Sequence, residues 1–130
     1  MLIAALVPTV LGSSVAAAAG NGPTSIAGAR VNASGNVLYW FNDFGGAPTV
    51  THHAGSGVYY VKFPNAPILG QNTGGNSVLS VTPDTPSADC TAVNADYANS
   101  GTATVVAVET KDCKNTFADR GFHLVVFGSK

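Results

Sequence analysis

Short apolar runs separated by turn residues extend through most of the chain, and no window shows a sustained 3.6-residue apolar repeat. Runs rich in β-branched and aromatic residues, bounded by glycine, proline, asparagine and aspartate, are typical of strands. We therefore expect strands at 27–31, 37–41, 49–53, 58–63, 78–82, 102–110 and 122–127. A short strand is also allowed at 67–69, and 91–97 fits either a strand or a short helical turn.

The segment 58–63 shows the clearest alternation, and Lys62 marks one of its faces as the solvent side. We assign to the core the three residues of the opposite face, Tyr59, Val61 and Phe63. Glycines at positions 55 and 57 permit the positive φ of a tight turn, so 49–53 and 58–63 are expected to form a hairpin. Seven or eight such strands predict an all-β fold, an antiparallel β-sandwich, with a small β-barrel as the alternative.

The first 19 residues carry no charge, and residues 2–11 form an apolar run of the length found in signal peptides. Small residues at 17–19 fit cleavage before Gly20, although a positively charged start is missing. The alternatives are a buried N-terminal helix and a membrane anchor, which Pro8 and the break at 12–14 disfavour. We expect a cleaved signal peptide at 1–19 and a single sandwich domain at 20–130.

Cys90 and Cys113 are the two cysteines of the sequence. An even count in an exported protein indicates a disulfide, and closing this loop would stabilise the fold by roughly 3 kcal/mol in the chain-entropy model. A reactive thiol would need a neighbouring base, which the local sequence does not supply. We therefore predict a Cys90–Cys113 bridge.

Charge and motifs exclude several classes of function. Six Lys and Arg against seven Asp and Glu give a net charge of −1, which argues against binding to nucleic acid or to anionic membranes. The sequence contains no GxSxG or GxxxxGK[ST] motif and no calcium-loop pattern. No pair stands out among the acidic residues, which are Asp43, Asp84, Asp89, Asp96, Glu109, Asp112 and Asp119.

The histidines also point away from a metal site. His52 and His53 are adjacent, and neighbouring strand residues face opposite ways, so we expect one half-buried and one exposed ring. His123 is expected to be a hydrogen-bonded residue at a strand edge. We predict no catalytic residue, no metal and no cofactor.

Aromatic residues are the remaining functional signal. The run Tyr39-Trp40-Phe41 must place at least one ring on each face of its strand. If one face is open to solvent, these rings could form a platform for a sugar or a protein. The predicted ligand-binding residues are Tyr39, Trp40 and Tyr60; the alternative is that both faces are covered.

Three motifs follow one another along the chain: VNxxGxV at 31–37, GxGxYxVxF at 55–63 and DxxFHLxV at 119–126. In this order they resemble a small β-rich module of secreted bacterial, often actinobacterial, proteins, with similar modules in phage tail and surface proteins. The resemblance covers about 30–127, implies a β-rich fold and carries over no catalytic residues. Members place cysteines nearer the GxGxY hairpin and the last strand than Cys90 and Cys113.

These observations together favour a secreted or cell-surface-associated, non-catalytic binding or structural module. Its expected partner is an extracellular protein or carbohydrate. One alternative is a small secreted hydrolase acting on an extracellular polymer, which would need two converging carboxylates, or His123 with an aspartate and a serine. Another is a small secreted inhibitor, presenting 84–89 as a reactive loop, or a carrier with a deep apolar cleft.

Overall fold

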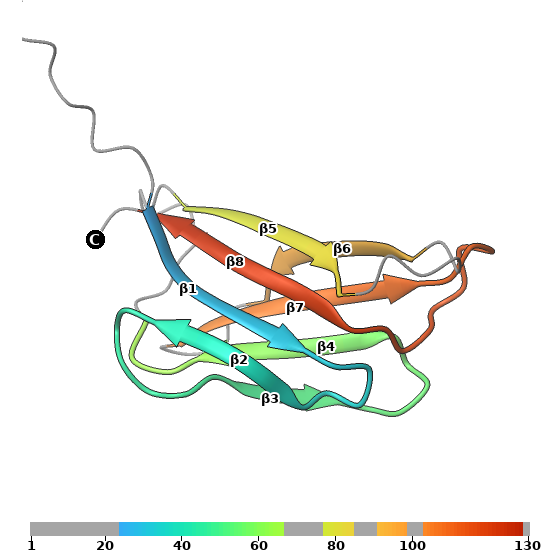
Figure 1. Ribbon diagram of the computed structural model, residues 1–130, viewed down its shortest axis with the longest axis horizontal. Helices are drawn as coiled ribbons and strands as arrows, with labels where there is room; N and C mark the ends of the chain where they lie inside the picture. Colours follow the sequence, from blue (N-terminus) through green and yellow to red (C-terminus); the bar gives the residue numbers. More distant parts are fainter. Residues whose placement is uncertain (1–23, 67–76, 85–90, 99–102, 129–130) are drawn as a thin grey trace, which may run out of the picture.

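The computed structural model describes residues 24–66, 77–84, 91–98 and 103–128. These residues form two antiparallel four-stranded sheets that do not close on each other, which confirms an all-β fold consistent with a β-sandwich (Figure 1). In order across the first sheet lie β2 (Val37–Asn42), β1 (Thr24–Val31), β8 (Phe122–Gly128) and β5 (Ser77–Pro83). The second sheet contains β3 (Thr49–His52), β4 (Val58–Phe63), β7 (Thr104–Lys111) and β6 (Ala92–Tyr97).

The strands coincide with the predicted segments to within a few residues at each end. The ambiguous segment 91–97 is a strand, because it pairs with β7 from Ala92 to Tyr97. The segments 1–19 and 67–69 lie outside the described residues. In the described ranges, no helix is long and apolar enough to cross a membrane.

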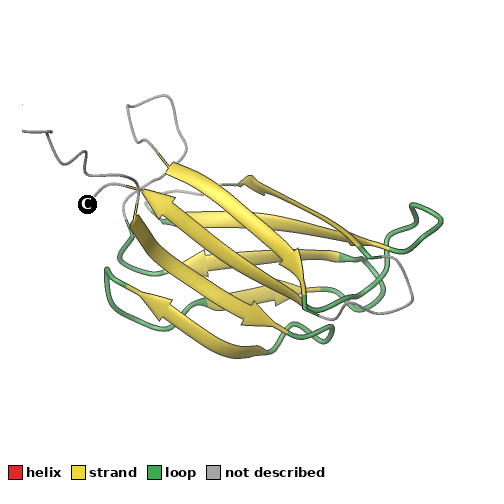
Figure 2. Cartoon of the chain, turned by 45° about the horizontal axis from the view of Figure 1, so that its top comes forward, coloured by secondary structure: helices red, strands yellow, loops and turns green. Residues whose placement is uncertain are grey.

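The core lies between the two layers, which Figure 2 shows one above the other. Alternation in β4 is as predicted: Lys62 is exposed and the three residues on the other face have no exposed surface. They pack against side chains that β1, β7 and β8 direct inwards, chiefly Ile26, Val31, Val106, Val108, Phe122, Leu124 and Val126. Burial of these apolar side chains is the main force that holds the two sheets together.

The predicted hairpin of β3 and β4 is present, with Thr49 opposite Lys62 and His52 opposite Tyr59. Its turn needs glycine at position 57, where φ is +62°. A Cβ at Gly57 would lie 2.6 Å from the Thr110 carbonyl oxygen, so the turn packs directly on β7.

The order β2-β1-β8-β5 determines which side chains meet on the outward face of the first sheet. Arg30 of β1 is opposite Tyr39 of β2 on one side and His123 of β8 on the other. Thr82 of β5 follows beyond His123. Directly opposed residues have Cβ atoms about 4.5–5.5 Å apart, so these four side chains form one continuous row across the sheet.

Cys113 lies in the exposed connection between β7 and β8, and the described residues contain no free cysteine. Its predicted partner Cys90 lies outside the described residues. The Cys90–Cys113 bridge therefore stays a prediction.

Candidate functional site

A network of three charged or polar side chains occupies one end of the outward face of the first sheet. The Arg30 guanidinium donates from Nε to Oδ1 of Asp84 at 2.7 Å and from Nη2 to Oδ2 at 3.2 Å. Nε2 of His123 lies 2.7 Å from the same Oδ1 atom. Because an ionised carboxylate only accepts hydrogen bonds, His123 carries a proton on Nε2.

Asp84 is the centre of this network. Its side chain is 11% exposed, whereas those of Arg30 and His123 are nearly half exposed. The hydrogen bonds from Arg30, and then from His123, hold the pKa of Asp84 below its usual range despite the opposing effect of burial. The carboxylate is therefore ionised at neutral pH, and its hydrogen bonds hold the side chains of Arg30 and His123 in place.

Next to the network, Phe41 lies over Gly28. A Cβ at Gly28 would lie 2.4 Å from Cε1 of Phe41, so the ring occupies the space that a side chain would fill. A glycine in mid-strand often marks such a close approach. The result is a shallow depression of about 160 Å³ with the lining residues Gly28, Ala29, Arg30, Tyr39, Phe41, His123, Leu124 and Val125.

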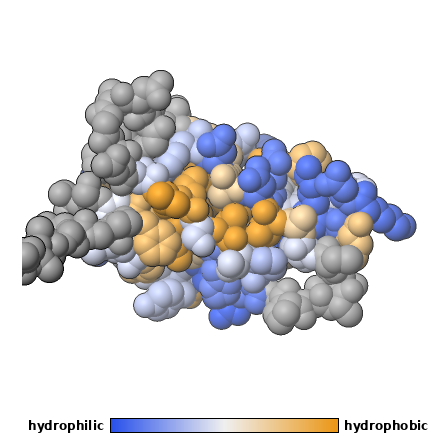
Figure 3. All heavy atoms as spheres, turned by 90° about the horizontal axis from the view of Figure 1, so that it is seen from above, coloured by the Kyte–Doolittle hydropathy of each residue, from blue (hydrophilic) through white to orange (hydrophobic). Residues whose placement is uncertain are grey.

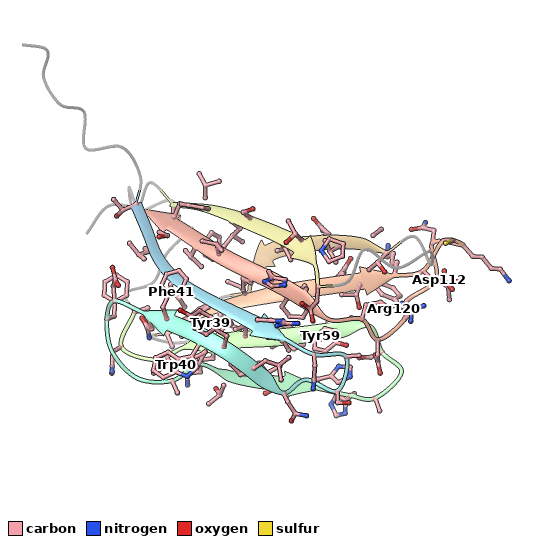
Figure 4. The ribbon with its side chains drawn as sticks, in the orientation of Figure 1. Tyr39, Trp40, Phe41, Tyr59, Asp112 and Arg120 are labelled. Atoms are coloured by element: carbon pink, nitrogen blue, oxygen red, sulfur yellow. The ribbon has the colours of Figure 1, made fainter. Side chains whose placement is uncertain are left out.

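Of the three predicted ligand-binding residues, Tyr39 belongs to this depression. It is 68% exposed, the largest value among the exposed large apolar and aromatic side chains of the described residues. Figure 4 shows Tyr39 and Phe41 close together on β2 and Trp40 displaced towards β3. Trp40 is opposite the buried Ala29 in the register, so it projects from the inner side of the sheet and is still partly exposed.

Tyr60 does not join them. It lies on the outward face of β4, in the other sheet, opposite Thr51 and Ala107. Its ring is exposed, but it faces away from the first sheet. The structure therefore brings Tyr39 together with Arg30, Asp84 and His123, and it leaves Trp40 and Tyr60 on separate surfaces.

The expectation for His123 needs one correction. Its ring is hydrogen-bonded, but β8 lies between β1 and β5 and is not an edge strand. His123 therefore lies on a central strand, near the end of that strand where Arg30 and Asp84 lie. The roles of Arg30, Gly28 and Phe41 were not predicted, although the short turn at 32–36 already indicates that 24–31 and 37–42 pair as a hairpin.

His52 and Asp119 form a second network, which has a structural role. Nδ1 of His52 lies 3.0 Å from the Val58 carbonyl oxygen, and Nε2 lies 3.2 Å from Oδ2 of Asp119. The ring stacks on Tyr59 with centroids 4.1 Å apart, and its side chain is almost fully buried. His53 is exposed, so the predicted contrast between the two histidines is confirmed.

Asp119 ties this network to the β3–β4 turn. Its carboxylate accepts the backbone N–H groups of Gly55 at 2.6 Å and Gly57 at 2.9 Å. Burial acts to raise the pKa of Asp119, but these hydrogen bonds and His52 outweigh burial and lower it. The His52 side chain is almost fully buried and the Asp119 carboxylate accepts two backbone N–H groups of the turn, so this network holds the β3–β4 turn in place.

The positions of the acidic residues bear on the hydrolase alternative. The described residues place a single carboxylate in the Asp84 network; Asp96 and Glu109 lie in the second sheet, and Asp112 and Asp119 in the β7–β8 connection. A glycosidase of the usual kind needs two. Nor do the described residues contain a group of three side chains suited to a metal ion.

Fold and site together define a β-sandwich with an aromatic, polar-bordered depression on one outward face. Comparison of the chain with models of protein families, with curated proteins and with solved structures finds no match. The resemblance to a secreted bacterial module therefore stays a prediction.

Proposed function

We propose that the chain is a secreted, non-catalytic binding module that holds a saccharide unit of an extracellular polymer against Tyr39. The observation that carries the proposal is the exposed Tyr39 ring in one row with the Arg30–Asp84–His123 network. An exposed aromatic ring offers an apolar face for the C–H side of a sugar, and convergent polar groups bind its hydroxyls.

The network has groups left for a ligand. Two of the five N–H donors of Arg30 are used on Asp84, which leaves three for a ligand or water. His123 uses Nε2 on Asp84, which leaves Nδ1 for a ligand or water. Because Asp84 already orders both side chains, binding costs little conformational entropy.

The charges of the network favour an uncharged ligand. Arg30 and Asp84 are bound to each other and cancel, so the site has no excess charge for an anionic polymer. Donors and acceptors side by side suit the hydroxyls of a neutral sugar, each of which both donates and accepts. The depression is smaller than the roughly 300–1,000 Å³ of enclosed ligand pockets, which favours surface binding over the carrier alternative.

A matched pair of tyrosine variants tests the site. Tyr39→Ala should weaken binding of soluble neutral oligosaccharides, followed by NMR shifts or calorimetry, by about tenfold or more. Tyr60→Ala removes an exposed ring from the other sheet and should leave the affinity unchanged. Equal effects of the two variants, or no binding of any neutral oligosaccharide or polysaccharide, would refute the proposal.

Secretion is supported by the apolar segment at 2–11 and the small residues at 17–19. Mass spectrometry of protein recovered from the culture medium should find Gly20 as the first residue. A cell-associated chain that still begins at Met1 would contradict this part of the proposal.

One observation favours the hydrolase alternative. His123 is hydrogen-bonded to Asp84, as a catalytic base is to the carboxylate that orients it. The alternative is tested with the polysaccharide that the chain binds. If the protein releases new reducing ends and Asp84→Asn abolishes this release, the function is hydrolysis and not binding alone. An unchanged polymer length at full binding supports the non-catalytic role.

A further inference from the structure

A second depression lies on the outward face of the second sheet, away from the Tyr39 depression. It has a volume of about 170 Å³, and its lining residues are Ala92, Val93, Asn94, Glu109, Lys111 and Asn115. The first three belong to β6, the next two to β7, and Asn115 to the connection between β7 and β8. This volume is below the roughly 300–1,000 Å³ of pockets for drug-sized molecules, so it suits a ligand with few non-hydrogen atoms.

The register places the two charged side chains of this depression on one face of β7. Glu109 is opposite Asn94 of β6, and Lys111 is opposite Ala92. Side chains alternate along a strand and Thr110 is buried, so Glu109 and Lys111 both point outwards. The side chain opposite Lys111 on β6 is only the methyl group of Ala92, so the space beside Glu109 and Lys111 is not filled by the protein.

The turn after β7 supplies the wall of the depression. The Asp112 carboxylate accepts the backbone N–H groups of Lys114 at 2.8 Å and Thr116 at 3.0 Å. The backbone N–H of Asn115 donates to the Asp112 carbonyl oxygen, and Asn115 adopts the left-handed conformation with φ of +60°. These bonds fix the turn, where Figure 4 shows Asp112, and they keep Asn115 beside β6 and β7.

The charged groups of the depression are not used within the described part of the protein. Glu109 and Lys111 form no ion pair with each other or with any other described residue. Among the same residues, the side chains of Asn94 and Glu109 form no hydrogen bond. The Lys111 ammonium lies over the Phe117 ring, 4.7 Å from its centroid, and this contact leaves it N–H donors for a ligand.

We propose that this depression binds a free α-amino acid. Residues two apart on one strand face are about 6.6–6.8 Å apart along the strand, so a small ligand can contact both charges. The ammonium group of the ligand binds Glu109 and its carboxylate binds Lys111, in charge-assisted hydrogen bonds. The carboxamides of Asn94 and Asn115 can donate and accept beside them.

The charges also determine which ligands fit poorly. Lys111 repels a ligand that carries only a positive charge, and Glu109 repels one that carries only a negative charge. In the Asp84 network, by contrast, the opposite charges are bound to each other. The amino-acid site needs neither that network nor a saccharide, so it stands independently of the proposed function.

Titration with small amino acids, followed by NMR shifts or calorimetry, tests the site. Glycine, alanine and serine carry both charged groups, whereas N-acetylglycine lacks the ammonium group and glycinamide lacks the carboxylate. At least one of the three amino acids should bind with a millimolar or lower dissociation constant, and the two probes should bind about tenfold or more weakly. Binding of none of the three, or equal binding of either probe, would overturn the proposal.

Two matched pairs of variants locate the site, and all four side chains are at least partly exposed, so the variants should fold. Glu109→Gln and Lys111→Met each remove one charge from the depression and should weaken amino-acid binding about tenfold or more. Asp96→Asn on β6 and Lys62→Met on β4 remove the same charges from residues that do not line it, and they should leave the affinity unchanged. Site variants without effect, or controls with an equal effect, would contradict the proposed location.

Discussion

Replacing Gly28 by alanine tests how tightly Phe41 is packed beside the Tyr39 depression. The added Cβ would lie 2.4 Å from Cε1 and 2.9 Å from Cζ of Phe41, and 3.0 Å from the Leu124 carbonyl oxygen. Ordinary contact begins at 3.4 Å, so the Phe41 ring must withdraw by about 1 Å. The carbonyl oxygen belongs to β8 and cannot move without disturbing the sheet.

The expected cost follows from two opposed effects. Alanine in mid-strand normally gains roughly 0.5–1 kcal/mol over glycine, because it loses less backbone entropy on folding. Overpacking of this kind costs about 1–3 kcal/mol. The free energy of unfolding of Gly28→Ala should therefore fall by about 1–2 kcal/mol, which for a domain of this size lowers Tm by about 4–8 °C.

Urea unfolding followed by circular dichroism and by the fluorescence of the single tryptophan, Trp40, measures this change. A double-mutant cycle with Phe41→Ala identifies the cause. In the Phe41→Ala background the methyl group meets Leu124 alone, so the cost of Gly28→Ala should shrink by about 1 kcal/mol. If Gly28→Ala is neutral, or costs the same in both backgrounds, the packing of Phe41 over Gly28 is wrong.

Two substitutions, one spectrum and one thiol titration probe the fold further. Tyr59→Phe removes the hydroxyl that donates to the Ala33 carbonyl oxygen at 2.8 Å and should cost about 1–2 kcal/mol in urea unfolding; a neutral result would contradict that bond. Burial of the ring raises the pKa of Tyr59 to about 12, so Tyr59 should contribute no phenolate absorbance to the ultraviolet spectrum at pH 10. The lowered folded pKa of Asp119 means that its stabilising contribution is present above its unfolded pKa of about 3.9 and is lost as pH falls through the folded value. Asp119→Asn should flatten the acid limb of the stability profile, and an unaltered limb would argue against the network. Thiol titration of the denatured, unreduced protein should find neither Cys90 nor Cys113 free; two titratable thiols would exclude the bridge.

Local alternation made the strand faces predictable from sequence. In β4 a single lysine between apolar residues was enough to orient the strand, and the Gly55–Gly57 turn indicated its hairpin partner. Both features act over a few residues. The two-layer fold follows because each strand must bury one face against another sheet.

The site depended on information that local patterns do not contain. Asp84 is 54 residues from Arg30 and 39 residues from His123, and the three meet because β8 lies between β1 and β5. The same sheet order leaves β2 at an edge, so Tyr39 and Trp40 are both exposed although they point to opposite sides. Order within a sheet depends on the whole set of pairings, which the alternation of a single strand cannot specify.

The pairing of Thr24 with Gly128 has a practical consequence for how this protein can be attached to a surface. The chain enters β1 and leaves β8 at the same pole of the sandwich, as Figure 1 shows, whereas Arg30 and His123 lie near the other ends of those strands. Figure 3 shows apolar side chains along the middle of the molecule, between the pole of Thr24 and Gly128 and the opposite pole. A surface attached beside Thr24 or Gly128, such as a sensor chip, would therefore face that pole and leave Arg30 and His123 pointing away from it.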